Sequence, residues 1–120
     1  MAKNDMCIIM YKILKYMYEC LKLGKMIDPE DICNNCEMFR IPQTYWTQIM
    51  KELIDHKYVS GVYEIKRIGT GESGIKFGVN TGITFEGVQF LEENSGMEKA
   101  ADFLGAPFET ILLNIISRIM

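Results

Sequence analysis

A helix, two strands and a further helix follow one another closely between Ile41 and Leu91, and this order restricts the fold more than any other feature of the chain. The first of these helices begins at Ile41-Pro42, because proline is favoured in the first turn of a helix. Its apolar residues recur at helical spacing and are Trp46, Ile49, Met50, Leu53 and Ile54. This spacing predicts a helix that buries one face and leaves the other in solvent.

Two strands are predicted next, on either side of a glycine-rich turn. Residues 62–68 and 75–83 are rich in β-branched and aromatic side chains, and residues 69–74 contain three glycines. This composition is typical of a hairpin with an exposed tip. Thr84 then supplies an N-cap for the next helix. Helix, hairpin and helix in this order are typical of a winged helix, and we expect the wing hairpin at about residues 61–83.

Two further helices are predicted before this unit. Residues 5–23 carry apolar side chains at helical spacing, which predicts a long amphipathic N-terminal helix that ends at Gly24. Asp28-Pro29-Glu30-Asp31 combines an N-cap residue, a first-turn proline and two carboxylates. This pattern predicts a short second helix that runs to about Cys36.

The C-terminal part is predicted to be a helical extension over about residues 95–120. Ser95-Gly96-Met97-Glu98 has the capping-box pattern, and Gly105 and Pro107 separate this helix from a last one. The last helix carries an apolar stripe made of Phe108, Ile111, Leu112, Ile115, Ile116 and Ile119. Such a stripe either forms a homodimer through the C-terminal helix or packs back onto the N-terminal helix. The expected fold is α+β: a single winged-helix domain, residues 1–120, with a long N-terminal helix and additional C-terminal helices.

The composition fits one compact domain. Hydrophobic residues make up 48% of the 120 residues, which is enough for a core without disulfides or metal. Lysine and arginine number 13 against 16 aspartates and glutamates, and this acidic balance argues against strong nonspecific DNA binding. The apolar run from Met6 to Tyr11 is too short for a signal-peptide core or a membrane span. We therefore expect a cytoplasmic protein that does not enter a membrane and whose cysteines stay reduced.

Two motifs resemble ligand sites and are better explained without a ligand. Gly69-x-Gly71-x-x-Gly74 matches a dinucleotide-binding pattern, but the chain continues as a strand where that pattern needs a helix. Cys33-x-x-Cys36 is half of a zinc site, and Cys7 and Cys20 would point to different faces of one helix, so small thiols are the favoured interpretation. His56 is the only histidine. We expect no metal, no cofactor and no catalytic residues.

The functional prediction depends on the polar face of the helix after Ile41-Pro42 and on the wing. Glutamine can bind adenine bidentately in the major groove, and threonine can contact thymine. Lysine and arginine beside the wing tip are suited to hold phosphates. The sequence therefore predicts a site for double-stranded DNA that consists of Gln43, Thr44, Thr47, Gln48, Lys51, Lys66, Arg67 and Lys76.

A second function stays open beside DNA binding. The predicted site also has carboxylates nearby, at Glu52, Asp55, Glu64 and Glu72, and the chain as a whole is acidic. Negative charge repels the phosphate backbone. The alternative is a winged-helix module that binds another protein without binding DNA.

Several short segments together are similar to one known family. They include Tyr11-Lys12-Ile13-Leu14, Asp28-Pro29-Glu30-Asp31-Ile32, Tyr45-Trp46 and Gly82-Ile83-Thr84-x-x-Gly87. On these segments the chain resembles the YjcQ-like family of small winged-helix proteins from Gram-positive bacteria and their phages. The resemblance implies a winged-helix fold and a DNA-associated role as a small transcriptional regulator of phage or prophage origin.

One residue departs from the usual winged-helix pattern. Lys57 stands before Tyr58-Val59, where winged helices often have glycine. A non-glycine residue in the left-handed conformation costs about 1 kcal/mol. We therefore expect the helix to end with a different cap here.

Overall fold

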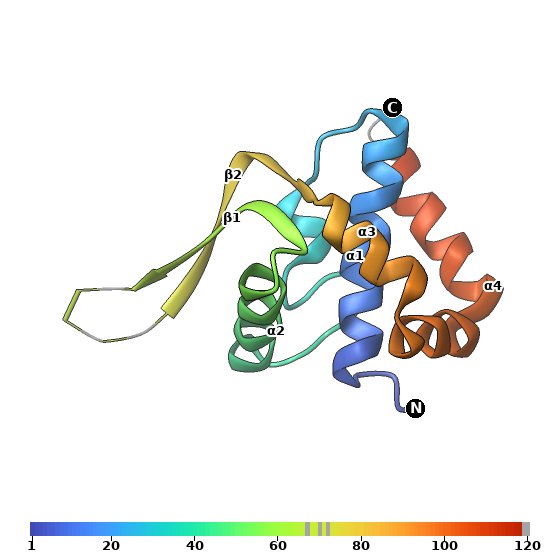
Figure 1. Cartoon of the computed structure of the whole chain (residues 1–120), viewed down its shortest axis with the longest axis horizontal. Coiled ribbons are helices and arrows are strands. Elements are labelled where there is room, and N and C mark those ends of the chain that lie inside the picture. Colours follow the sequence, from blue (N-terminus) through green and yellow to red (C-terminus); the bar gives the residue numbers. More distant parts are fainter. Residues whose placement is uncertain (67, 70, 72, 119–120) are drawn as a thin grey trace.

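The computed structural model describes residues 1–66, 68–69, 71 and 73–118, which form four α-helices, one 3-10 turn and a two-stranded antiparallel sheet (Figure 1). The elements in chain order are α1 (Met6–Leu23), η1 (Pro29–Ile32), α2 (Gln43–Asp55), β1 (Val59–Lys66), β2 (Ser73–Ile83), α3 (Phe85–Glu93) and α4 (Ser95–Ser117). This confirms the α+β class and the predicted order of helix, hairpin and helix. The arrangement is compatible with a winged helix.

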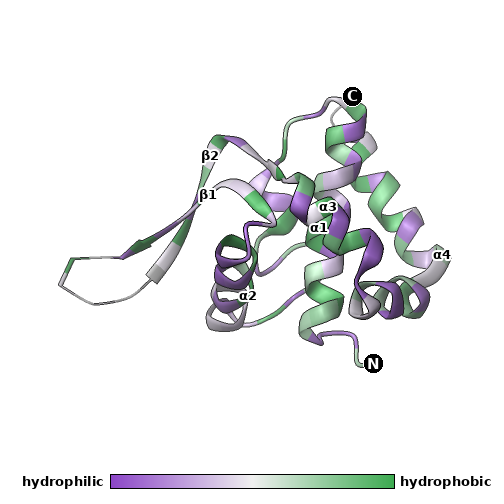
Figure 2. Cartoon of the chain, viewed as in Figure 1, coloured by the Kyte–Doolittle hydropathy of each residue, from purple (hydrophilic) through white to green (hydrophobic). Residues whose placement is uncertain are grey.

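Helix α1 lies at the centre of the core and contacts α2, β2, α3 and α4. It is mostly apolar in Figure 2, and its buried residues are Ile8, Ile9, Met10, Tyr11, Ile13, Leu14, Tyr16, Met17 and Cys20. The predicted length and the stop at Gly24, which has φ 69°, are confirmed. The prediction that α1 has one exposed polar face and one buried apolar face is wrong. Lys12 and Lys15 are half-buried, whereas Leu21 is 60% exposed. The middle of α1 is covered by α2, β2, α3 and α4, whereas residues 21–24 at its end are exposed.

The second helix is much shorter than predicted. Only Pro29–Ile32 forms a helical turn, and Asp28 caps it by accepting a hydrogen bond from the Glu30 N–H at 3.0 Å. Residues 33–41 instead form a turn closed by the Ile41 N–H, which donates to the Asn34 oxygen at 2.9 Å. Adjacent asparagines favour such turns over helix. The turn buries Met38 and Phe39 under the body of the protein.

The exit of α2 keeps the left-handed conformation that we expected to be replaced. Lys57 has φ 62° and is the non-glycine residue at positive φ within the described chain. The Lys57 carbonyl accepts a hydrogen bond from Thr84 Oγ1 at 2.6 Å, and the Tyr58 N–H donates to the Leu53 oxygen at 3.0 Å. Thr84 also caps α3 as predicted, by accepting from the Gly87 N–H. Contacts to α3 therefore hold this strained exit in place.

Strands β1 and β2 form a hairpin that projects from the helical body (Figure 1). The first strand begins at Val59, three residues earlier than predicted. Pairing runs from Val59↔Ile83 to Lys66↔Ser73, with a register shift between Ser60 and Val62. The shift places Gly61, at φ 69°, against the backbone of Asn80 and Thr81. Residues 78–81 therefore bulge out of β2.

Helix α4 covers the remaining side of α1. Its cap is Asn94, which accepts from the Gly96 and Met97 N–H groups, so the predicted start at a Ser95 capping box is wrong by one residue. A break at Gly105 confirms the predicted division into two parts. Within the described residues this helix is long and apolar enough to span a membrane by length and composition. Its buried residues after the break, Phe108, Leu112, Ile115 and Ile116, nevertheless pack inside the chain, where α4 contacts α1.

Candidate nucleic-acid interface

The polar face of α2 is open to solvent. Gln43, Thr44 and Gln48 are exposed and Thr47 is half-buried. Their polar groups bond within the helix: Gln43 Nε2 lies 3.5 Å from Thr47 Oγ1, and Gln48 Nε2 lies 3.2 Å from Glu52 Oε1. The C-terminal helix packs on α1 instead of covering this face. The four predicted base-contacting residues therefore lie together on one accessible surface.

Contacts on the opposite face hold α2 firmly. Trp46 Nε1 donates to the Ile32 oxygen at 2.8 Å in the buried interior, and its ring lies 6.2 Å from that of Phe77 in β2. Tyr45 Oη donates to the Asn4 oxygen at 2.8 Å. The two hydrogen bonds connect α2 to η1 and to the N-terminal segment, and the ring contact connects it to the hairpin. The orientation of its polar face is therefore set by three separate parts of the chain.

Lys51, the fifth predicted residue on α2, is engaged in an ion pair. Its Nζ lies 3.2 Å from a carboxylate oxygen of Glu64 in β1. Both side chains are about one-third exposed, and ion pairs near the surface contribute about 0–1 kcal/mol. Lys51 would have to leave Glu64 in order to contact a phosphate.

The predicted group of cations at the hairpin tip is divided between two faces. Residues paired across a sheet lie on the same face, and successive residues alternate. Lys66 pairs with Ser73 and shares its face with Glu64, which lies towards α2. Lys76 pairs with Tyr63 and lies on the opposite face. Arg67 is outside the described residues, so the structure does not place it.

Apolar side chains on the hairpin were not recognised as exposed from the sequence. Tyr63 is 57% exposed, Ile65 is 44% exposed, and Ile68 is fully exposed. Tyr63 and Ile65 alternate with Glu64, so they share the face of Lys76. The strand pattern predicted the alternation, but it did not show that the hairpin leaves the body after Val62.

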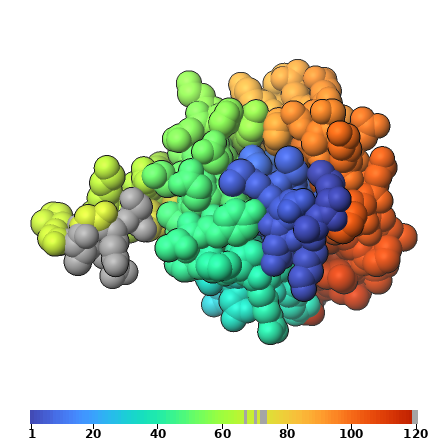
Figure 3. Space-filling model, turned by 90° about the horizontal axis from the view of Figure 1, so that it is seen from below, coloured from blue at the N-terminus to red at the C-terminus, as the bar shows by residue number. Residues whose placement is uncertain are grey.

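Further cations lie at the N-terminal end of α2. Lys3, Lys12 and Arg40 line a cavity of about 540 Å³ together with Glu37. Figure 3 shows the N-terminal residues, in blue, beside the green surface that includes α2. Lys12 Nζ donates to the Met38 oxygen at 2.7 Å, and burial lowers the pKa of this lysine.

Only Arg40 among these cations could have been assigned to this surface from the sequence. Arg40 directly precedes Ile41-Pro42 and could have been included as a residue at the start of α2. Lys3 could not, because the Tyr45–Asn4 hydrogen bond joins residues 41 positions apart.

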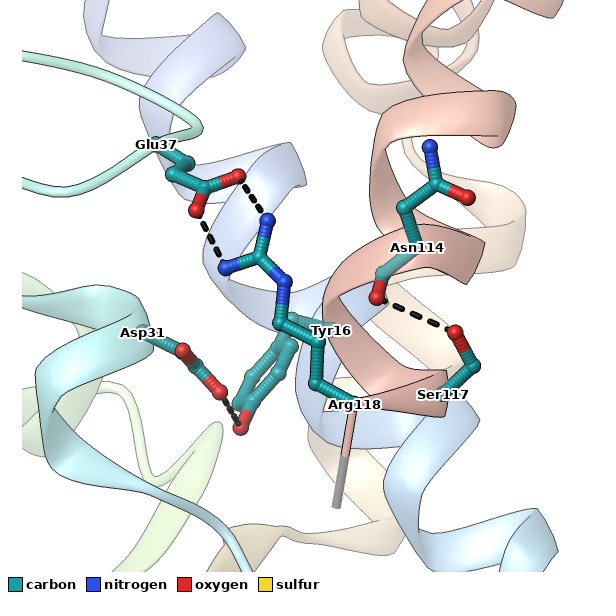
Figure 4. A network of polar contacts seen from close by, with 6 residues as sticks. All are labelled: Tyr16, Asp31, Glu37, Asn114, Ser117 and Arg118. Atoms are coloured by element: carbon teal, nitrogen blue, oxygen red, sulfur yellow. Dashed lines mark hydrogen bonds and ion pairs between the residues drawn. The ribbon is translucent and has the colours of Figure 1, made fainter. Parts of the chain in front are cut away.

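A polar network fixes the end of α4 near η1 (Figure 4). Arg118 binds the Glu37 carboxylate with two guanidinium nitrogens. Tyr16 Oη donates to Asp31 Oδ2 at 2.6 Å and accepts from the Asp28 N–H at 3.1 Å. Burial, and then the bond to Asp31, raise the pKa of Tyr16 far above its ordinary value, and burial also raises the pKa of Asp31. Tyr16 is only 1% exposed, so its bonds to Asp31 and to the Asp28 N–H support the interior, whereas the Arg118–Glu37 ion pair lies at the surface.

The cysteines and the single histidine lie in ordinary structural surroundings. Cys33 Sγ lies 3.3 Å from the carbonyl oxygens of both Glu30 and Asn35, and Cys20 is buried in the core. His56 ends α2, is exposed, and stacks on Tyr58 with ring centres 5.4 Å apart. Over the described part of the chain, no three residues of the His, Cys, Asp or Glu types are grouped to hold a metal ion.

Residues 11–105 match the model of a protein family described as YjcQ protein. This match covers α1 from residue 11 onward, all of η1, α2, the hairpin and α3, and the part of α4 before its break. No curated protein and no solved structure matches the chain.

Proposed function

The chain belongs to the YjcQ family, and on that basis we propose that it is a small cytoplasmic winged-helix protein that binds double-stranded DNA as a transcriptional regulator. The observation that supports this most is the uncovered polar face of α2 beside a projecting hairpin. In a winged helix such a helix enters the major groove and the hairpin contacts the backbone beside it.

The base contacts in this proposal come from two turns of α2. Gln43 and Gln48 are exposed and can each bind an adenine edge, and Thr44 can contact a thymine methyl group. Their bonds within the helix are long or exposed, so little is lost when they exchange for bonds to bases.

The phosphate contacts come from both ends of this surface. Lys66 lies on the α2 side of the hairpin, and Lys3 and Arg40 lie at the other end, beside the start of α2. Lys51 joins them after it leaves Glu64. Lys76 faces away from α2, so we assign it a smaller share of phosphate binding than the sequence suggested.

Binding of a fluorescent random-sequence duplex at increasing salt tests the proposal. We expect affinity to fall steeply with salt, and each lost phosphate contact to flatten the logarithmic slope by about 0.9. Lys66→Ala and Arg40→Ala should flatten it, whereas Lys99→Ala, an exposed lysine on α4, should not. Absence of binding at ~50 mM salt, or an unchanged slope in both test variants, would contradict the proposal.

The second candidate function, a protein-interaction module, is favoured by the apolar face of the hairpin. Tyr63 and Ile65 are too exposed to serve the core, and exposed apolar patches often mark protein interfaces. Replacing both with serine should leave the fold and the DNA affinity unchanged if the hairpin serves DNA alone. A partner that binds the native chain with little salt dependence, and is lost in this double variant, would support the module instead.

A homodimer through the C-terminal helix is proposed on the outer side of α4. Four residues of the predicted stripe, Phe108, Leu112, Ile115 and Ile116, are buried, Ile111 is exposed, and Ile119 lies outside the described residues. Leu113, which the predicted stripe did not include, is also exposed. Sedimentation of the native chain and of Leu113→Ser would test this surface: dimer loss in the variant supports it, and a native monomer at ~100 μM refutes it.

A further inference from the structure

A groove lined in part by a lysine with a buried ammonium lies beside β2. Its walls come from residues 21–29, at and after the end of α1, from residues 76–83 of β2 and from Ser60 in β1. Figure 1 shows the loop after α1 descending beside β2. The groove encloses about 730 Å³. We call it the β2 groove.

The lining of the β2 groove is largely apolar. Met26 is 78% exposed and Val79 is 88% exposed, while Ile27, Phe77 and Ile83 form deeper parts of the wall. Sites for small molecules have this size and character: an apolar lining with a few polar groups in fixed places. Met26 and Val79 lie outside the core, so packing of the core does not explain why these positions are apolar.

The charge in the groove has one sign. Among the described residues, the charged ones that line it are both lysines, Lys25 and Lys76. Lys76 is exposed on the hairpin, but Lys25 is different: its Nζ is buried and has no hydrogen-bond partner among the described residues. A buried ammonium without a partner is strongly unfavourable. An anion in the groove would supply the missing partner once the Lys25 side chain turns towards it.

The shape of β2 decides between a peptide and a small molecule. A peptide strand binds a sheet by continuous backbone pairing along an open edge. Residues 78–81 bulge out of β2, and Thr81 Oγ1 bonds back to the carbonyl oxygens of Gly61 and Gly78 at 3.0 and 2.7 Å. Bulges of this kind interrupt an edge and protect it from strand addition.

We propose that the β2 groove binds a small amphiphilic carboxylate. The Lys25 side chain turns from its buried position so that its Nζ donates hydrogen bonds to the carboxylate, and the apolar body of the ligand lies between Met26 and Val79. The buried ammonium of Lys25 matches a group with one negative charge. This site is separate from the α2 surface, so it stands independently of the proposed DNA binding.

Titration of the full chain with sodium octanoate, followed by the amide NMR signals of Gly78 and Gly82, tests the proposal. We expect saturable shifts of both signals, and octan-1-ol, which lacks the charge, should bind at least about tenfold more weakly. Lys25→Met should weaken octanoate binding about tenfold or more and remove the preference over octan-1-ol. Lys99→Met, which changes an exposed lysine on α4, should bind octanoate as the native chain does.

Val79→Ser provides a second variant that cannot disturb the core, because Val79 is exposed. It should weaken octanoate and octan-1-ol to a similar degree. The proposal fails if octanoate gives no saturable shifts at ~10 mM, or if Lys25→Met binds octanoate unchanged. It also fails if octanoate does not bind but the blocked peptide acetyl-Val-Asp-Val-amide shifts the signals of Gly78 and Gly82 in the native chain and not in Lys25→Met. The occupant would then be a peptide.

Discussion

Gly87 lies where α3 touches the exit of α2, and replacing it with alanine tests whether this contact sets the position of the hairpin. An added Cβ would lie 2.1 Å from the Tyr58 oxygen and 2.7 Å from Ile83 Cγ1. Bringing the first of these to 3.0 Å requires the two backbones to separate by about 0.9 Å. The same Tyr58 oxygen accepts the Thr84 N–H at 3.0 Å, so this hydrogen bond would be lengthened or lost.

The expected magnitude follows from three opposing effects. Overpacking in a dense region destabilises by about 1–3 kcal/mol, and a lost hydrogen bond by about 1 kcal/mol. Alanine is favoured over glycine inside a helix by about 1 kcal/mol. We therefore expect Gly87→Ala to lower the free energy of unfolding by about 1–3 kcal/mol, measured by urea unfolding followed by circular dichroism.

Gly82→Ala is the matched control, because a Cβ at Gly82 would meet nothing within 4 Å. This variant should unfold within about 0.5 kcal/mol of the native chain. If Gly87→Ala were equally stable, the close approach of α3 to Tyr58 would not be what fixes the hairpin, and the reasoning from backbone contact would be refuted.

Three further changes have defined outcomes in the same unfolding assay. Lys57→Gly should raise the free energy of unfolding by about 0.5–1 kcal/mol, because it relieves the left-handed strain at φ 62°; a loss would show that the lysine side chain stabilises the exit. Tyr16→Phe should lower it by about 1–3 kcal/mol near pH 7, because Asp31 and the Asp28 N–H lose their partner. The pKa of Tyr16 in the folded chain is raised above 10.0, so its contribution to the free energy of unfolding is complete below about pH 10 and is lost as the pH rises further. The free energy of unfolding of Tyr16→Phe should therefore fall less steeply above about pH 10 than that of the native chain, and an equally steep fall would contradict this. Leu112→Ala should lose about 2–5 kcal/mol because Leu112 is fully buried, and a change below 1 kcal/mol would contradict packing on α1.

The fold was largely predictable where local patterns are strong. The helical spacing around Trp46 and the glycines between the two strands each determine one element with few alternatives. The second helix was overestimated, because a good start at Asp28-Pro29 says nothing about how far a helix continues. The burial of Lys12 was missed for another reason: it depends on neighbours from the opposite end of the chain.

The candidate site was predictable as a surface but not as a set of charges. Exposure of Gln43 and Gln48 follows from the position of Trp46 on the same helix. Whether Lys66 and Lys76 share a face depends on the pairing register, which the sequence left undetermined. The ion pair of Lys51 with Glu64 likewise requires the position of the hairpin relative to α2.

The central position of α1 has a consequence for synthesis of the chain. The ribosome makes α1 before α4, whose buried residues from Met97 to Ile116 cover it. A nascent chain therefore exposes the part of α1 that α4 covers until α4 has been translated. Its solubility during this interval depends on partial cover by α2 and α3, or on chaperones that bind exposed apolar segments.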